Sequence, residues 1–325
     1  MVAANEWFAM SVLLLGPRSD PQLAAVERAL ETRGVDTCVW DADDWPGAGA
    51  LTYHQGDQTR LTVDGMPADG VHTTYLRNFA LNPRLSEYRD DLEDHPFALL
   101  NQLREYQATL ESMLYSLAAR GVRMVNPLET QDLHTRKPWQ LERLDAAGVP
   151  VPETLTTTDP EAVRSFADRL GAIVYKPVSG GGHAAVLTPD DLDADRLSLL
   201  ANSPVQFQEY VDGEDIRVFV VDGEVVAAAR IVSDELDYRT ADHDVERIPL
   251  SALEPEISEA AVTATDCLGL AFSGIDVIDT DGGCTVLEAN PSPMFAAFDE
   301  KAGTDVAGAL ADHLATPAET EPAAA

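Results

Sequence analysis

The fold is decided by the stretch GIDVIDTDGGCTVLEANPSP, residues 274–293. Two alternating apolar runs flank an Asp-Gly-Gly turn, a pattern typical of a β-hairpin. If residues 281–283 form a three-residue loop, Asp276 lies directly opposite Glu288, and the two-residue period of a strand places Asn290 on the same face. The hairpin therefore brings two carboxylates and an amide oxygen together.

These three side chains predict a metal site. Neighbouring carboxylates repel each other unless a cation lies between them, and hard oxygen ligands without His or Cys favour Mg²⁺ or Mn²⁺. An EF-hand over residues 279–282 is excluded, because its acidic spacing is incomplete and strands flank it. The alternative is a solvated acidic sheet face, which the acidic composition of the chain keeps open.

Lysine is scarce in this chain, whose only lysines are Lys137, Lys176 and Lys301. Each one is therefore a candidate for chemistry. Lys176 lies in a strand expected over residues 172–178 and precedes the glycines at positions 180–182. This run matches neither a dinucleotide-binding fingerprint nor a Walker loop. Glycine N–H groups without side chains around them can close over phosphates, although a plain loop is the alternative.

The N-terminal part of the chain is predicted to form an open α/β unit. A strand over residues 11–15 precedes a helix that opens at Pro21, and a second strand covers residues 37–40. An apolar stripe over residues 97–117 predicts a long helix packed on the core, with a partner site as the alternative. Met10 is a candidate natural start, with the first nine residues as an extension.

The rest of the chain is predicted to mix helices with antiparallel strands. A helix is expected over residues 133–147, an acidic helix over residues 190–200 and a hairpin over residues 217–231. The tail over residues 316–325 is rich in Pro, Glu and Ala and is expected to be disordered. The fold class is therefore α+β with an α/β N-terminal unit.

The charge balance limits the partners and the compartment. Lys and Arg number 22 against 56 Asp and Glu, which gives a formal net charge of -34 and argues against a nucleic-acid partner. Such charge is tolerated best where salt screens it, so we expect a salt-accumulating cytoplasm, with an ordinary acidic protein as the alternative. The chain has no eighteen-residue apolar run, which argues against a membrane span. Homo-oligomerisation is left open.

Six short segments follow one another in a recognisable order. They are Lys137, IVYKP at residues 173–177 with the glycines at 180–182, QEYV at 208–211, DIRVF at 215–219, GIDV at 274–277 and LEANPSP at 287–293. In this order they closely resemble the ATP-grasp superfamily, and the DIR and EANPSP segments look most like the RimK-like glutamate ligases.

The resemblance covers roughly residues 125–315 and implies a division of the chain. It implies an ATP-grasp fold, with a preceding α/β domain over residues 1–125, a lid subdomain over residues 126–207 and a C-terminal subdomain over residues 208–315. In similar proteins ATP lies between two sheets.

The resemblance also implies roles for individual residues. The strand over residues 208–211 would be the hinge between the two sheets, and its backbone groups would bind the adenine. One of two neighbouring carboxylates would meet the ribose. Lysines and the glycine loop would hold the phosphates, and the hairpin would hold two Mg²⁺ or Mn²⁺ ions. In this chain the hinge is Glu209, Tyr210 and Val211, the ribose candidates are Asp215 and Glu214, the phosphate group is Lys137, Lys176, Gly180, Gly181 and Gly182, and the metal set is Asp276, Glu288 and Asn290.

The implied reaction is the ATP-dependent joining of a carboxylate to an amine through an acyl-phosphate. Anionic intermediates require cations, and we expect Arg217 to stabilise them, with Arg239 as a second candidate whose alternative is a surface salt bridge. A further arginine, Arg77, is a candidate for binding a carboxylate. His183 follows the glycines and is interpreted as a loop residue, with a phosphate contact as the alternative.

The chain departs from the family at residues 240–244, TADHD, where RimK-like ligases usually carry a Ser/Thr-Asn pair and a basic, glycine-rich stretch. Because this loop lies toward the substrate side, the resemblance does not decide whether glutamate is the acid or the amine that the enzyme joins. The acceptors that the resemblance implies are a small molecule and a peptide or protein terminus. The alternatives are a ligase for another small molecule and a non-catalytic ATP-binding regulator.

Overall fold

The computed structural model describes residues 12–42, 49–56, 59–68, 70–77, 88–179, 182–233, 235–236 and 243–316. Among the expected site residues, Gly180, Gly181 and Arg239 lie outside these ranges, as do the N-terminal extension and the tail beyond residue 316. The chain divides into two compact units, Met1–Leu128 with Ala307–Ala325, and Glu129–Val306. In the part of the chain that is described, no helix is long and apolar enough to cross a membrane.

The first unit is an α/β unit, as the sequence predicts, and it is built on a parallel sheet. Its strand order is β2-β1-β6-β7, and a second small sheet has the order β3-β4-β5. Asp20 accepts a hydrogen bond from the backbone N–H of Gln22 and so caps the first helix, with Pro21 at its first position. The elements are β1 (Val12–Gly16), α1 (Pro21–Thr32), β2 (Thr37–Asp41), β3 (Leu51–His54), β4 (Arg60–Val63), β5 (Met66–Pro67), β6 (Thr73–Leu76), α2 (Arg89–Asp94), α3 (Pro96–Ala118), β7 (Arg123–Val125) and the closing α9 (Val306–Ala315).

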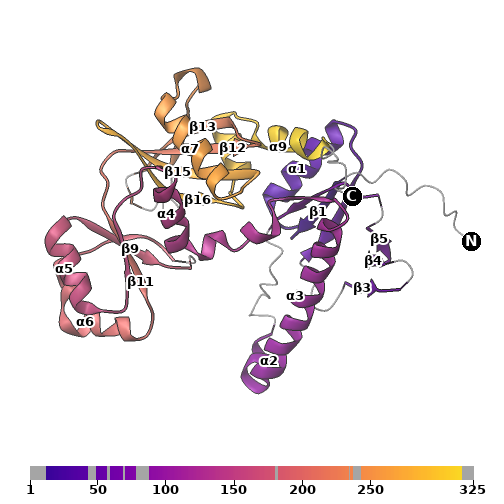
Figure 1. The fold of residues 1–325 in the computed structure, drawn as a ribbon, viewed down its shortest axis with the longest axis horizontal. Coiled ribbons are helices and arrows are strands. Elements are labelled where there is room, and N and C mark those ends of the chain that lie inside the picture. The colour runs from indigo at the N-terminus through magenta and orange to yellow at the C-terminus, as the bar shows by residue number, and fades with distance from the viewer. Residues whose placement is uncertain are drawn as a thin grey trace, which may run out of the picture. The chain divides into compact units, whose positions relative to one another are not determined.

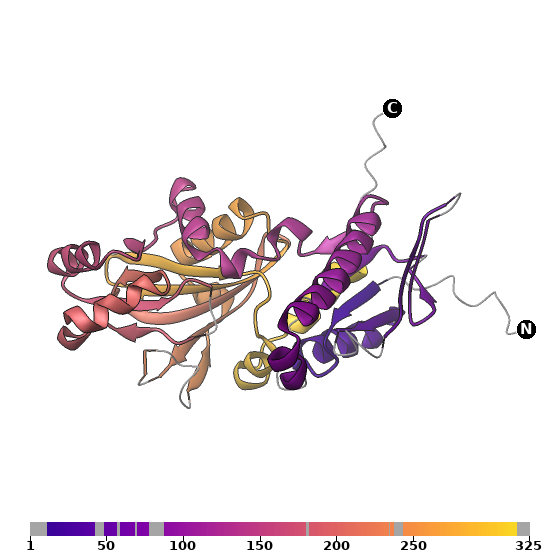
Figure 2. The ribbon, with the colours of Figure 1, turned by 90° about the horizontal axis from the view of Figure 1, so that it is seen from below.

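The long helix α3 is only partly a core helix. Figure 2 shows it lying across the strands of the first unit, where Leu110, Met113 and Leu117 are buried. Its first turns run beyond the strands beside α2 (Figure 1), and there Phe97 is 81% and Leu100 45% exposed. The prediction of one continuous core stripe is therefore wrong for the first half of the helix.

The second unit contains a small antiparallel sheet in the order β10-β9-β11-β8. Helices α5 and α6 pack on one face of it (Figure 1), around a core that includes Phe166, Ile173 and Phe207. The expected acidic helix over residues 190–200 is broken, because Asp193 takes an extended conformation. The elements are β8 (Thr154–Thr157), α5 (Pro160–Leu170), β9 (Ile173–Pro177), β10 (Ala185–Val186), η4 (Pro189–Leu192), α6 (Ala194–Ser198), η5 (Leu199–Ala201) and β11 (Val205–Glu209).

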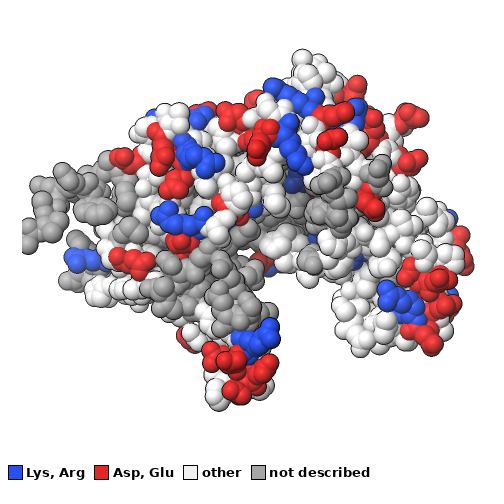
Figure 3. All heavy atoms as spheres, turned by 180° about the vertical axis from the view of Figure 1, so that it is seen from behind, with Lys and Arg blue, Asp and Glu red and all other residues white. Residues whose placement is uncertain are grey.

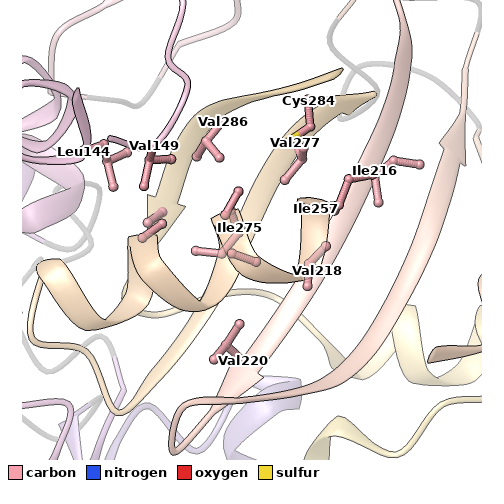
Figure 4. Packing of buried hydrophobic residues seen from close by; sticks show 14 of the residues in the cluster. Leu144, Val149, Ile216, Val218, Val220, Ile257, Ile275, Val277, Cys284 and Val286 are labelled. Atoms are coloured by element: carbon pink, nitrogen blue, oxygen red, sulfur yellow. The ribbon is translucent and has the colours of Figure 1, made fainter. Parts of the chain in front are cut away.

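A larger antiparallel sheet in the order β14-β13-β12-β15-β16 completes this unit. Figure 4 shows α7 lying across these strands, with the side chains of Ile257, Val218 and Ile275 in the layer between them. The elements are η2 (Leu128–Thr130), η3 (Leu133–Thr135), α4 (Lys137–Ala146), β12 (Glu214–Val221), β13 (Glu224–Val232), β14 (Asp244–Arg247), η7 (Leu250–Ala252), α7 (Pro255–Cys267), β15 (Phe272–Thr280), β16 (Gly283–Asn290) and α8 (Ala296–Ala302).

The two sheets of the second unit have separate hydrophobic cores. The expected boundary between residues 207 and 208 falls inside β11. We therefore propose to place the boundary between lid and C-terminal subdomains after Glu209, where the chain leaves the smaller sheet.

On the face shown in Figure 3, acidic side chains are scattered with basic ones among them. Of the three cysteines, Cys38 and Cys284 are buried and Cys267 is half-buried. Cys38 and Cys284 each belong to a hydrophobic core.

Candidate active site

The hairpin of β15 and β16 carries the candidate metal oxygens. Asp276 lies opposite Glu288, as predicted, and Gly274 lies opposite Asn290. The predicted three-residue loop is wrong, because Thr280 pairs with Gly283 and the loop has only two residues. A two-residue loop alone would set Leu287 opposite Asp276. A β-bulge beside Asp276 takes up Leu287 as the extra residue and restores the pairing.

The bulge also reverses the alternation of β16. Before it, Cys284 and Val286 are buried in the core; after it, Ala289 is the buried residue. Glu288 and Asn290 therefore stand on the opposite face from Val286. If Leu287 were paired regularly and no bulge formed, strict alternation would direct both of them into the apolar core.

Arg217 binds Asp276 from the neighbouring strand. The two residues are directly opposite each other on β12 and β15, and Arg217 Nη1 donates to Asp276 Oδ1. Asn290 Nδ2 donates to Asp276 Oδ2 at 3.1 Å. Arg217 is 7% exposed, and its guanidinium carbon lies 5.3 Å from the ring centroid of Phe219. Packing and charge therefore both fix the position of Arg217.

Lys137 binds the second carboxylate. Its Nζ lies 2.5 Å from Glu288 Oε2, and both side chains are mostly buried. The helix expected from residue 133 begins instead at Lys137, after a separate 3₁₀ turn, so this lysine is the first residue of α4. Cations supplied by the protein thus neutralise both carboxylates of the hairpin.

Burial and charge move the pKa values of the two carboxylates in opposite directions. Burial raises the pKa of Asp276, and the charge of Glu288 adds to this effect, while Arg217 opposes it. Burial would also raise the pKa of Glu288, but Lys137, Lys176 and Arg217 together outweigh it and lower this pKa to about 2.

Acidification is expected to remove a stabilising contribution of Glu288. Because its pKa in the folded protein lies below the ordinary value of 4.5, the contribution is complete above pH 4.5 and is lost as the pH falls toward about 2. It amounts to about 3 kcal/mol. Asp276 has a raised pKa and acts in the opposite sense, so that its ionisation costs stability as the pH rises above 3.8.

The Glu288→Gln variant separates these effects. Urea unfolding between about pH 2 and pH 6 should show a flatter dependence of the unfolding free energy for this variant than for the wild type. If the unfolding free energies of the two proteins change in parallel with pH, the ionisation of Glu288 does not contribute to stability.

Gly274 leaves room for the guanidinium. A Cβ atom at this position would lie 2.6 Å from Arg217 Nη2 and 2.7 Å from Pro293 Cβ. Gly274→Ala is therefore expected to displace Arg217 and to lower kcat by about 10- to 100-fold. Gly282→Ala in the hairpin turn is the matched control, because its Cβ would make only an ordinary 3.8 Å contact. Equal kcat values for the two variants would contradict this assignment.

Lys176 lies on the polar face of the smaller sheet. It pairs across strands with Gln206, whereas Tyr175 and Phe207 contribute to the apolar core on the other face. The charge of Lys176 helps to lower the pKa of Glu288, so this face carries a cation close to the hairpin. The structure therefore brings Lys137 and the two carboxylates together, and the charge of Lys176 acts on Glu288.

Two backbone N–H groups of the hinge already donate hydrogen bonds within the protein, so fewer groups there could bind a base. The N–H of Glu209 donates to the carbonyl of Glu153 at 2.9 Å, and that of Tyr210 donates to the carbonyl of Ala172 at 3.1 Å. The hinge carbonyls and the Val211 N–H remain as candidates for this contact.

Strand alternation distinguishes the two ribose candidates. Asp215 shares its face of β12 with Arg217, whereas Glu214 shares its face with the core residue Ile216. Glu214 also forms an ion pair with Arg230 at 2.6 Å. Asp215 is therefore the better candidate.

Two other expected site residues, Gly182 and Arg77, lie close to other parts of the protein. Gly182 lies so close to Pro177 that an added Cβ would come within 2.7 Å of its ring. Arg77 belongs to the first unit, where its Nε binds Asp20 Oδ2 at 2.8 Å in a buried ion pair. Its expected carboxylate-binding role stays a prediction.

The donor set fits a magnesium ion. In the described part of the chain, no group of three or more His, Cys, Asp and Glu side chains gathers for a metal. The candidate set instead combines Asp276 and Glu288 with the amide oxygen of Asn290, and these are hard ligands. Sequence reasoning missed Gln140, whose amide binds the backbone of Ala289; its place three residues after Lys137 was the only local indication.

Comparisons with known proteins give a consistent result. A model of the RimK-like ATP-grasp domain matches residues 135–314. A probable alpha-L-glutamate ligase of Aliivibrio salmonicida is 30% identical over 190 residues, which cover 56% of this chain and 63% of that protein. A protein of the same name from Rhodopirellula baltica is 25% identical over 276 residues, 79% of this chain and 67% of its own.

Solved structures match over nearly the whole chain. The ATP-grasp ligase PsnB, complexed with a phosphomimetic variant of its minimal precursor, Mg and ADP, is 32% identical with a TM-score of 0.85, and the match covers 94% of this chain and 98% of PsnB. The macrocyclase MdnC, bound to the precursor peptide MdnA from Microcystis aeruginosa, shares the fold at 24% identity, with a TM-score of 0.76 and coverage of 94% and 99%.

Proposed function

Because this chain belongs to the RimK-like ATP-grasp family, we propose that it joins a carboxylate to an amine with ATP, releasing ADP and phosphate. The observation that carries this proposal is the convergence of Arg217, Lys137 and Lys176 on the two hairpin carboxylates. A chain with no need to handle phosphate would gain little from three buried or half-buried cations around one acidic pair.

The residues have distinct tasks in this proposal. Asp276, Glu288 and Asn290 hold one or two Mg²⁺ ions, which neutralise phosphate charge when bound. Lys137 and Lys176 bind the phosphate chain. The substrate carboxylate attacks the terminal phosphorus, and the amine then attacks the acyl carbon of the acyl-phosphate, so that phosphate leaves. Arg217 stabilises the negative charge that develops in both steps.

We propose a peptide as one of the two substrates. The similarity to PsnB, which is complexed with precursor peptides, extends over 94% of this chain, whereas the match to the Aliivibrio salmonicida relative covers 56% of it. Addition of glutamate is the second candidate, supported by the name of the curated relatives. We also propose that the enzyme works in the cytoplasm and binds neither nucleic acid nor a membrane. Mn²⁺ is proposed to replace Mg²⁺ in the reaction.

The test is ADP release from ATP and Mg²⁺ in buffer with molar KCl, with paired carboxylate and amine substrates. Acidic peptides containing an internal lysine should lose one water in the mass spectrum if the enzyme cyclises them. Free glutamate with a peptide should instead give an adduct. Binding of ATP without substrate-dependent ADP release by any pair would favour the non-catalytic alternative.

A further inference from the structure

We propose that Gln140 is a positioning residue that locks the register of β16 and thereby keeps Glu288 and Asn290 on the site face of the sheet. The inference rests on the proposed function, since it concerns the metal oxygens of the same site. Gln140 lies on α4, one helical turn after Lys137, and is 1% exposed.

The Gln140 side chain occupies the place of a neighbouring strand. Its Nε2 donates to the carbonyl of Ala289 at 2.8 Å, and the N–H of Ala289 donates to its Oε1 at 2.8 Å. Since β16 is the outermost strand of its sheet, this amide satisfies backbone groups that β15 cannot reach. A second anchor precedes it, where the N–H of Val286 donates to the carbonyl of Pro150 at 2.8 Å.

The two anchors bracket the bulge. Leu287 is the extra residue, and Val286 and Ala289 lie on either side of it. Regular pairing without a bulge would set Leu287 opposite Asp276 and turn Glu288 toward the core face. The Gln140 amide binds the backbone of Ala289 in the bulged register, which places Ala289 opposite Ile275 and its side chain in the core. Without it, Ala289 loses both hydrogen bonds at the outer edge of the strand, and Glu288 depends on its pairing with Asp276 and its ion pair with Lys137.

The first test compares Gln140→Leu with Thr265→Val. Thr265 shares a buried hydrogen bond of 2.6 Å with Ser273 in the same unit, so its variant also loses a buried hydrogen bond but leaves β16 untouched. Mn²⁺ binding in the presence of ADP, followed by electron paramagnetic resonance, should weaken by about 10- to 100-fold in Gln140→Leu only. Thermal unfolding shows whether each variant is folded and how much stability it has lost.

The second test removes the bulge. Deleting Leu287 keeps Val286 opposite Val277 and Glu288 opposite Asp276 in a regular ladder. In this background Gln140→Leu should leave Mn²⁺ affinity unchanged, although it still removes two hydrogen bonds. An equal loss in both backgrounds would show that Gln140 does not act through register.

The outcomes separate this inference from the proposed function. If the wild type binds Mn²⁺ with ADP and Gln140→Leu binds it equally well, the inference alone is overturned. If the wild type binds no Mn²⁺ with ADP, both are overturned.

Discussion

Replacing Arg217 by lysine is expected to lower kcat by about 100- to 1,000-fold while the protein stays folded. Lysine keeps a positive charge beside Asp276, but it lacks the planar fork of donors that can hold Asp276 and an anionic reacting group together. Steady-state kinetics at saturating ATP, with thermal unfolding alongside, measure the two effects separately.

Two further variants make this prediction specific. Arg217→Ala should lose activity and also about 3–5 kcal/mol of stability, because Asp276 is left buried without its partner. Arg230→Lys on β13 is the matched control, because Arg230 pairs with the exposed Glu214 and Glu246. If Arg217→Lys retains the kcat of the control, Arg217 acts only in the structure and not in the reaction.

Replacing Lys137 by methionine is expected to weaken ATP binding by about 10- to 100-fold, the loss of one charge-assisted hydrogen bond. The same change leaves Glu288 without its ion-pair partner. The ligand-free variant should therefore be less stable than the wild type, and Mg²⁺ should raise its unfolding temperature more, since the cation takes the place of the ammonium.

Lys301→Met is the control for this experiment. Lys301 lies on α8 and donates to the carbonyl of His243 at 3.0 Å, away from the hairpin carboxylates. Calorimetric titration with a non-hydrolysable ATP analogue gives the affinity, and unfolding with and without Mg²⁺ gives the stability. An equal Mg²⁺ response in the two variants would contradict the role of Lys137 at Glu288.

The parts of the fold that depend on local chemistry were predictable. The Asp222-Gly223 turn joins β12 to β13 with both residues at positive φ, 51° and 75°, as an Asp-Gly hairpin turn requires. Asp20 and Asp159 cap helices that each begin with proline. Each feature depends on a few consecutive residues, so the sequence alone suffices to place it.

Other features depend on tertiary packing. Helix α7 escaped prediction because the residues it buries include Ala260, Ala261 and Ala264, whose small side chains give a weak periodic signal. The pairing of Asp276 with Glu288 was predicted correctly from an incorrect loop length, since the bulge supplies the residue that the turn lacks. The ion pair of Lys137 with Glu288 joins residues 151 positions apart, and no local pattern reveals it.

The edge position of β16 has a consequence for solubility. An outermost strand with unpaired N–H and C=O groups is a template on which another chain can add a strand and begin to aggregate. Here the Gln140 amide and the Pro150 carbonyl cap Ala289 and Val286 at that edge. The strand that carries Glu288 and Asn290 is thus shielded from intermolecular pairing by groups that also hold its backbone.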